Sequence, residues 1–337
     1  METEIPKKRK AEKRVRIIIV FLCVILGLLL TVGLVLTHNW NDPVEQYPTT
    51  NLYITEYGKT MVSAHRSGSG IFPENTMMAF EGCIQSELFR TDIFEFDLHL
   101  TKDGQLIILH DDTLDRTTDS LEVLGVKNAR PENYTLAELR QLNFGEGFID
   151  DAGERPYKGL RGNDIPEGLR VSTLEDVLSY LEENGSFSYV IEIKNSKTLG
   201  RRAADKLYEI LCERGMLNKV IVGTFHGEIT RYLDETYPDM LRSAGISEVL
   251  GFYFDSLFGR ERRPDHYRFK ALQIPANQFY IKLGTSRLIN YAHKHNIAVQ
   301  YWTINDADDI RALRDVGADC VMSDVPDLAF KVLNGEA

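Results

Sequence analysis

Cysteine is scarce in this chain, and the cysteines present follow no disulfide or metal-ligand pattern. There are four, of which Cys23 lies in an apolar run near the N-terminus. The other three are Cys83, Cys212 and Cys320, and no CxxC pair occurs. An odd number without paired spacing argues against a disulfide framework and a thiolate metal site. We therefore expect these three side chains to be buried as small apolar groups.

Glycine-rich phosphate loops are also missing. The GxGxxG pattern that opens a dinucleotide-binding sheet does not occur, and Ser67-Gly68-Ser69-Gly70 is too weak a substitute. No internal repeat or low-complexity tract stands out either. For an α/β chain, the open doubly wound sheet is therefore the less favoured architecture.

Negative charge outnumbers positive charge beyond the N-terminus. Residues 1–16 carry seven Lys or Arg and three Glu, which gives +4, whereas the whole chain carries −11. Subtracting the first from the second leaves −15 for the rest of the chain. A domain this acidic is not expected to bind nucleic acid, and an anionic substrate would need a local cationic pocket.

A long apolar run covers residues 17–37, which are 21 residues without a charge. This length suits a helix that spans a bilayer. A cleavable signal peptide is the alternative, but its apolar region is usually shorter, and no A-x-A-like site follows the run. The basic flank marks the cytoplasmic side. We predict a single-pass protein of the cell membrane, with a cytoplasmic tail (1–16), an anchor (17–37), a stalk (38–59) and an extracytoplasmic catalytic domain (60–337).

Beyond residue 59, short apolar runs alternate with amphipathic ones. We expect strands at 60–64, 92–98, 105–109, 188–194, 219–224, 240–246, 270–274, 297–303 and 319–323. We expect helices at 75–86, 173–184, 200–214, 226–237, 285–295, 306–315 and 326–333. This alternation predicts parallel strands with crossover helices, and the number of units suits a (β/α)8 TIM barrel. Residues 113–170 break the rhythm and are predicted to form an insertion over the barrel mouth, with one short helix near 135–142.

Charged side chains stand on two of the expected strands. On the first, alternation places Glu95 and Asp97 on one face and apolar residues on the other. On the second, Glu192 and Lys194 share a face in the same way. Carboxylates this close on a buried strand repel one another and lose hydration, so a compensating cation is expected.

His65 and His110 each end a further expected strand, so they should meet the carboxylates at the C-terminal mouth of the barrel. Three carboxylates without cysteine favour one hard divalent cation, Ca²⁺ or Mg²⁺, over zinc. Two histidines beside such an ion can act as general base and general acid. Arg66 and Lys194 add positive charge suited to a phosphate. These residue types predict metal-assisted cleavage of a phosphodiester.

Four ordered blocks of the sequence resemble the glycerophosphodiester phosphodiesterase family, in its membrane-anchored bacterial type. The first block is His65-Arg66 followed by Pro73-Glu74-Asn75-Thr76. The second block begins with Phe94-Glu95-Phe96-Asp97 and continues with Thr101-Lys102-Asp103-Gly104, Leu109-His110-Asp111 and Leu114-Asp115-Arg116-Thr117-Thr118. The other two are Ile191-Glu192-Ile193-Lys194 and Tyr301-Trp302-Thr303-Ile304-Asn305. The resemblance covers about residues 60–333. It implies a barrel whose metal ligands are Glu95, Asp97 and Glu192 and whose acid/base pair is His65 and His110. It further implies that Glu74 and Asn75 brace the site and that Trp302 lines the substrate cleft.

Two positions need comment. The family usually has Gly directly after His-Arg, whereas this chain has Ser67. Serine fits there if the backbone angle φ is negative, and a positive φ would strain it. His99 continues the alternation of Glu95 and Asp97, yet we expect it beyond the strand, as a solvated loop residue.

The leading hypothesis is metal-dependent hydrolysis of glycerophosphodiesters to sn-glycerol 3-phosphate and an alcohol. In the mechanism that the family implies, one histidine accepts the proton of the glycerol 2-hydroxyl while its oxygen attacks phosphorus. The other histidine protonates the leaving alcohol, and water then opens the cyclic phosphate. We assign the base to His65 and the acid to His110, although the residues alone leave the exchanged assignment open.

Two alternatives remain. A lysophospholipase D-like or teichoic-acid phosphodiesterase activity would be favoured by an exposed apolar rim on the insertion, with Phe144, Phe148, Ile149 and Tyr157 as candidates. A catalytically inactive anchored binding protein would be favoured by loss of the acids or histidines, and none of them is lost.

Overall fold

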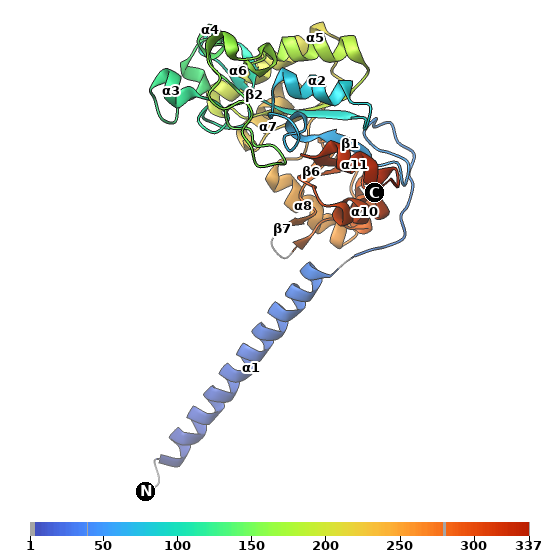
Figure 1. Ribbon diagram of the computed structural model, residues 1–337. Helices are drawn as coiled ribbons and strands as arrows, with labels where there is room; N and C mark the ends of the chain where they lie inside the picture. Colours follow the sequence, from blue (N-terminus) through green and yellow to red (C-terminus); the bar gives the residue numbers. More distant parts are fainter. Residues whose placement is uncertain (1–3, 39, 279–280, 337) are drawn as a thin grey trace.

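A long N-terminal helix and a barrel domain make up the protein (Figure 1). The computed structural model describes residues 4–38, 40–278 and 281–336. Helix α1 (Glu4–Thr37) projects away from the domain and contains the predicted anchor. Its stretch Arg16–Val35 is long and apolar enough to cross a membrane, and its side chains are exposed.

Seven parallel strands form most of the barrel wall. In spatial order they are β5 (Val220–Gly223), β4 (Ser188–Ile193), β2 (Ile93–Leu100), β1 (Met61–Ala64), β10 (Cys320–Ser323), β9 (Ala298–Tyr301) and β6 (Ala271–Ile274). Arg242 and Ser243 bridge the two ends of this row, because Arg242 pairs in parallel with Val222 of β5 and Ser243 pairs with Ala271 of β6. These eight positions confirm the predicted TIM barrel.

Helices follow the strands and cover the wall. They are α2 (Met77–Gln85), α5 (Leu174–Asn184), α6 (Lys197–Glu213), α7 (Gly227–Thr236), α8 (Ile246–Leu257), α9 (Ser286–Lys294), α10 (Ala307–Asp315) and α11 (Pro326–Leu333). All seven helices expected beyond residue 59 are present. Helix α8 was not expected, because Ile246 and Leu250 are exposed while Phe252 and Tyr253 are buried. With apolar residues on both faces it lacks the amphipathic period that marks a surface helix.

The segment expected as a stalk lies along the barrel over residues 40–57. At one end, Asp42 forms an ion pair with Arg287 of α9 at 2.8 Å. Further on, the hydroxyl of Tyr53 donates to the carbonyl oxygen of Lys219 at 2.5 Å, and this side chain is 1% exposed. Tyr53 packs with apolar side chains of the strands, among them Ile93, Val190, Ile221 and Ala298. It therefore closes the N-terminal end of the barrel, opposite the mouth.

The insertion after β2 forms a small lobe with its own core. Strand β3 (Leu106–Ile108) pairs antiparallel with β2 and leads into the lobe. The lobe contains α3 (Ser120–Leu124), α4 (Leu136–Leu139) and the 3-10 turns η2 (Pro131–Asn133), η3 (Gly162–Asp164) and η4 (Glu167–Leu169). Its core includes Leu114, Leu139, Leu142 and Phe144. The remaining short elements are η1 (His65–Ser67) and the hairpin β7 (Asn277–Gln278) and β8 (Ile281–Lys282).

Two side-chain positions differ from the expectations. Cys83 and Cys320 are buried as predicted, but Cys212 is exposed. Helix α6 buries Leu207 and Leu211, so the residue after Leu211 turns about 100° away from the core. His99, expected in a solvated loop, is fully buried inside β2. Strand β2 extends to Leu100 because β3 pairs back against its end.

Candidate active site

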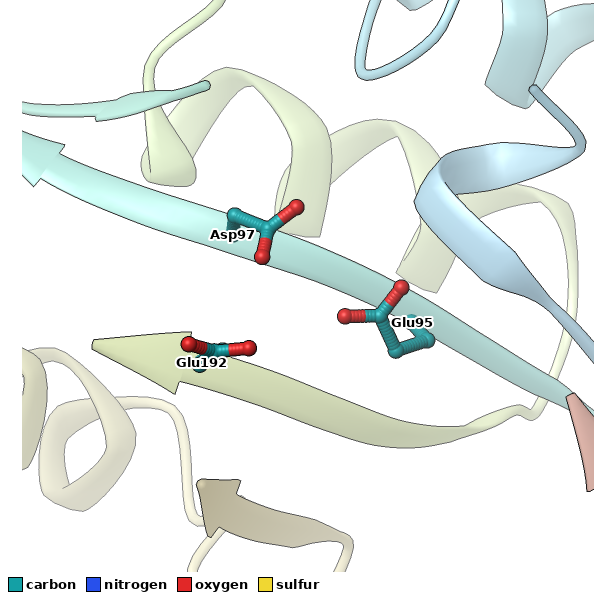
Figure 2. Close-up of side chains that lie close together, drawn as sticks. All are labelled: Glu95, Asp97 and Glu192. Atoms are coloured by element: carbon teal, nitrogen blue, oxygen red, sulfur yellow. The ribbon is translucent and has the colours of Figure 1, made fainter. Parts of the chain in front are cut away.

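Glu95, Asp97 and Glu192 converge inside the barrel, as Figure 2 shows. Glu95 and Asp97 alternate along β2, and Glu192 lies directly across from Asp97 on β4. One carboxylate oxygen from each residue lies within 4.8 Å of the others. Glu95 and Asp97 are 5% and 1% exposed. Three carboxylates at this spacing, with hard oxygen donors, fit the ligand set of Ca²⁺ or Mg²⁺.

Burial and mutual repulsion make this cluster unfavourable without a cation. Burial, followed by the charge of Asp97, raises the pKa of Glu95 to about 8. The same two causes, in the same order, raise the pKa of Glu192. A divalent cation removes the repulsion and holds the ionised forms, so the electrostatics of the cluster fit a bound ion.

Neighbouring donors brace each carboxylate. The backbone N–H of Arg66 donates to Glu95 at 2.8 Å, and the side-chain amide of Asn75 donates to Asp97 at 2.9 Å. Lys194 Nζ lies 2.9 Å from Glu192 and 3.7 Å from Asp97. Asn75 thus lies where the predicted bracing role requires. Lys194, which we expected to contact a phosphate, thus lies directly against two residues of the carboxylate cluster.

His65 is oriented by a carboxylate that our sequence analysis missed. Its Nδ1 lies 2.6 Å from an oxygen of Asp324, and its Nε2 faces Glu95 at 3.9 Å. Asp324 also accepts from the Ser69 hydroxyl at 2.5 Å and from the Asn305 amide at 2.7 Å. Burial acts to lower the pKa of His65, but the hydrogen bond to Asp324 and the charge of Glu95 outweigh it and raise the pKa. One ring nitrogen is therefore fixed, and the other is presented to the carboxylate cluster.

His110 is held in a parallel way by the residue that follows it. Its Nδ1 lies 2.7 Å from an oxygen of Asp111, and its Nε2 accepts from the guanidinium of Arg66 at 2.9 Å. Because a guanidinium only donates, His110 here carries its proton on Nδ1. Arg116 pairs with both Asp111, at 2.6 Å, and Glu74, at 2.7 Å. The predicted bracing residue Glu74 therefore acts on His110 through Arg116 and Asp111.

The turn after β1 carries backbone strain where the sequence departs from the family pattern. Ser67 has a φ of +63° and Arg66 a φ of +48°, both in the left-handed region. Such residues cost about 1–3 kcal/mol each and persist only where surrounding contacts hold them. Here the turn aims the Arg66 N–H at Glu95, and the Arg66 carbonyl oxygen accepts from the Asn75 N–H at 3.0 Å. Ser67 is accommodated with strain, in the geometry that favours glycine.

Five of the polar site residues line one cavity of about 390 Å³. Its polar wall is formed by His65, Arg66, Asp97, His110 and Glu192. Its other wall is largely apolar and includes Phe225, Ile246, Val249, Pro275, Leu283 and Trp302. Trp302 thus lies in the predicted cleft. A lining that combines charged side chains with apolar ones suits a ligand with a charged group and a carbon skeleton.

The apolar rim that would favour a lysophospholipase D-like or teichoic-acid activity is largely absent from the insertion. Phe144 is 4% exposed, and Phe148 and Tyr157 are half-buried with ring centroids 6.1 Å apart. Ile149 alone of these four candidates is well exposed, at 58%. The lobe buries most of these side chains because it needs them for its own packing. Apolar surface at the mouth is instead supplied by Phe225 and Ile246.

Comparison with known proteins identifies relatives across the barrel domain. The model of the glycerophosphoryl diester phosphodiesterase family matches residues 65–328. A glycerophosphodiester phosphodiesterase of Bacillus altitudinis is 26% identical over 277 residues, which cover 81% of this chain and 98% of the relative. A lysophospholipase D of Rattus norvegicus is 24% identical over 300 residues, covering 80% of this chain and 85% of the relative.

Solved structures with the same fold include a glycerophosphodiester phosphodiesterase from Agrobacterium tumefaciens. Its TM-score is 0.58 at 22% identity, covering 80% of this chain and 98% of the other. An Oleispira antarctica phosphodiesterase, solved with the product sn-glycerol-3-phosphate, has a TM-score of 0.60 at 22% identity, covering 81% of this chain and 96% of the other. At these identities the structural likeness supports the fold alone.

Proposed function

Since the chain belongs to the glycerophosphoryl diester phosphodiesterase family and is an enzyme of that family, we propose that it hydrolyses glycerophosphodiesters to sn-glycerol 3-phosphate and an alcohol. The observation that carries this proposal is the shared cavity. Two carboxylates of the three-carboxylate cluster, Asp97 and Glu192, line it together with the two carboxylate-oriented histidines. Arg66 and Lys194 supply the positive charge that a phosphate needs in an otherwise acidic chain.

Glu95, Asp97 and Glu192 would hold one divalent cation, Ca²⁺ or Mg²⁺. When bound, such an ion polarises the phosphate and acidifies a hydroxyl beside it. Arg66 would bind the phosphate from the His110 side, and Lys194 would do so from the Glu192 side. Trp302, whose ring lies 5.9 Å from that of Phe225, would pack against the glycerol skeleton.

In the proposed mechanism, His65 Nε2 takes the proton of the glycerol 2-hydroxyl as that oxygen bonds to phosphorus. The bond from phosphorus to the alcohol oxygen breaks, and His110 gives that oxygen the proton on its Nε2, for which it must enter the step as an imidazolium protonated on both ring nitrogens. Water then opens the cyclic phosphate with the two histidine roles exchanged. Asp324 and Asp111 stabilise the imidazolium that forms on each histidine in turn. In the structure His110 Nε2 accepts from Arg66 and so carries no proton, which is the form that the exchanged assignment requires. A leaving-group experiment distinguishes the two assignments.

The proposal is tested by an activity panel. The full chain is assayed with glycerophosphocholine, glycerophosphoethanolamine, glycerophosphoinositol and lysophospholipids, each with Ca²⁺, with Mg²⁺ and with chelator. We expect release of sn-glycerol 3-phosphate from at least one diester in the presence of one ion, and none with chelator. A chain that binds either ion and cleaves no member of the panel would contradict the proposed activity.

Replacing Asp324 by Asn is expected to lower kcat/KM by about 10- to 10³-fold, because His65 loses the carboxylate that fixes its orientation. Asp324 raises the pKa of His65, so the limb of the pH–rate profile that reports the ionisation of His65 should move to lower pH in Asp324→Asn. A pH profile of kcat/KM measures both effects. Asp306→Asn is the matched control, since Asp306 caps α10 and contacts no site residue. An unshifted profile in Asp324→Asn would contradict the positioning role.

We further propose that α1 anchors the protein in the cell membrane with the barrel outside the cytoplasm. Support comes from the apolar stretch Arg16–Val35 and the basic residues before it. Protease added to intact cells should digest the barrel domain and spare residues 1–16, as read by epitope tags at the two ends. Digestion of the domain only after the cells are lysed would reverse the topology.

A further inference from the structure

Four large apolar side chains stand exposed in a row that begins at the mouth and continues along α8. Phe225, in the loop after β5, is 52% exposed, and Ile246, Leu250 and Phe254 on α8 are 68%, 51% and 39% exposed. The three residues on α8 recur every four positions, so they form one row along the helix. We call this group of four the ledge. Much of the surface of these four side chains is left open to solvent.

The ledge borders the cavity. Phe225 and Ile246 line the apolar wall directly, and Val249 of α8 lies beside them. The Phe225 ring meets Trp302 edge-on, at 5.9 Å and 84°. The ledge is therefore continuous, through Phe225 and Ile246, with the lining of the cavity that also includes Asp97, Glu192 and the two histidines.

The end of the membrane helix is tied to the same flank. The carbonyl oxygen of Trp40 accepts from the N–H of Arg287 at 3.2 Å, and the Arg287 guanidinium lies 4.3 Å from the Trp40 ring centroid. The Ser286 hydroxyl donates to the Asp42 carbonyl oxygen at 2.6 Å. Both Ser286 and Arg287 lie in the first turn of α9, which follows the cavity-lining Leu283.

The tether between membrane and mouth is short. Helix α1 ends at Thr37, three residues before Trp40. Three residues reach about 10 Å at most. The α9 rim therefore lies close to the surface of any bilayer that α1 crosses. Helix α8 packs against α9, and the end of α1 lies beside the β7–β8 hairpin, with α8 on the same side of the domain (Figure 1).

From this arrangement we propose that the ledge docks on the outer leaflet of the membrane that α1 crosses, and that the cavity takes lipid-borne substrate there. This inference rests on the proposed anchoring and the proposed function. Leu, Ile and Phe side chains enter the interfacial region readily, and Trp40 suits the boundary where a membrane helix ends. The substrate class that fits is a glycerophosphodiester with one acyl chain, since it keeps the free 2-hydroxyl that the mechanism requires.

Docking is tested with the full chain in phosphatidylcholine vesicles that contain brominated acyl chains. Leu250→Trp adds an emitter on the ledge, and Leu88→Trp adds one at a 71%-exposed site between α2 and β2, at the opposite end of the barrel. After subtracting the parent emission, we expect at least twofold quenching at position 250 and none at 88. No quenching at 250, or equal quenching at both, overturns the docking. Hydrolysis of soluble glycerophosphocholine, measured in parallel, tests the proposed function separately.

Substrate supply is tested with Leu250→Asn combined with Phe254→Asn, and with Leu88→Asn as the control. For monoacyl glycerophosphocholine in vesicles, the double variant should raise KM about tenfold, whereas KM for soluble glycerophosphocholine should change less than twofold. If the double variant does not fold, quenching of the fluorescence of Phe254→Trp by the brominated lipids is measured in its place. A parent chain that cleaves only the soluble diester, or a folded double variant with unchanged KM for both, overturns the ledge as a route of supply.

Discussion

Replacing either His65 or His110 by Ala should lower the rate of diester hydrolysis by about 10²–10⁴-fold, the range expected for loss of a general acid or base. Both rings present Nε2 to one cavity, and a carboxylate holds Nδ1 of each. Because the two act on one reaction, the double variant should lose much less than the product of the single losses. Steady-state kinetics of the three variants, with folding checked by circular dichroism, measures this.

A substrate with an activated leaving group assigns the roles. A nitrophenyl ester needs no proton on its leaving oxygen, so it should restore the rate of the acid variant and leave the base variant slow. Rescue of His110→Ala alone supports His110 as the acid, and rescue of His65→Ala alone supports the exchanged assignment. His266→Ala is the control, since His266 is an exposed histidine whose ring packs on Tyr267, away from the cavity. Unchanged turnover in His65→Ala or His110→Ala would contradict the acid/base role of that residue.

Replacing Glu95 by Gln should weaken metal binding and hydrolysis together, by at least about 10²-fold, because loss of mere outer-shell support already costs about 10–100-fold. The change keeps the size of the side chain and removes one of three anionic ligands. Ca²⁺ and Mg²⁺ affinities by calorimetry and kcat/KM against ion concentration measure the two losses. Glu183→Gln, an exposed acid on α5, is the matched control. Activity that survives both Glu95→Gln and chelator would exclude the ion as a catalyst.

Stabilisation by the ion should grow with pH. Without a cation, Glu95 has a pKa of about 8 against an ordinary 4.5, so between these values the folded chain binds more protons than the unfolded one. Its contribution to stability then falls as pH rises through that window. A bound ion holds the ionised form and removes this loss. The increase in Tm on adding Ca²⁺ or Mg²⁺ should therefore be larger at about pH 8 than at about pH 5. An increase in Tm that is the same at both pH values would indicate that the ion binds away from Glu95.

Much of the site could be predicted from local sequence because a strand has a period of two. Alternation alone puts Glu95 and Asp97 on one face, and the rule that parallel strands end at a common mouth adds His65 and His110. The anchor is equally local, since 21 uncharged apolar residues need no tertiary context to indicate a membrane span. Each of these predictions depends only on residue spacing or composition along a short stretch of the chain.

Other features depend on contacts between distant parts of the chain. Asp324 orients His65 from 259 residues away, and no local pattern relates them. Helix α8 could not be predicted from an amphipathic pattern, because its apolar residues face both the core and solvent. The ion pair between Asp42 and Arg287, 245 residues apart, ties the end of α1 to the flank that carries the ledge. The sequence by itself predicted the apolar N-terminal helix, the barrel and the candidate site residues, because each follows from local composition or periodicity. Only the tertiary structure decided how the histidines are held and which flank lies beside the anchor, because both depend on long-range packing.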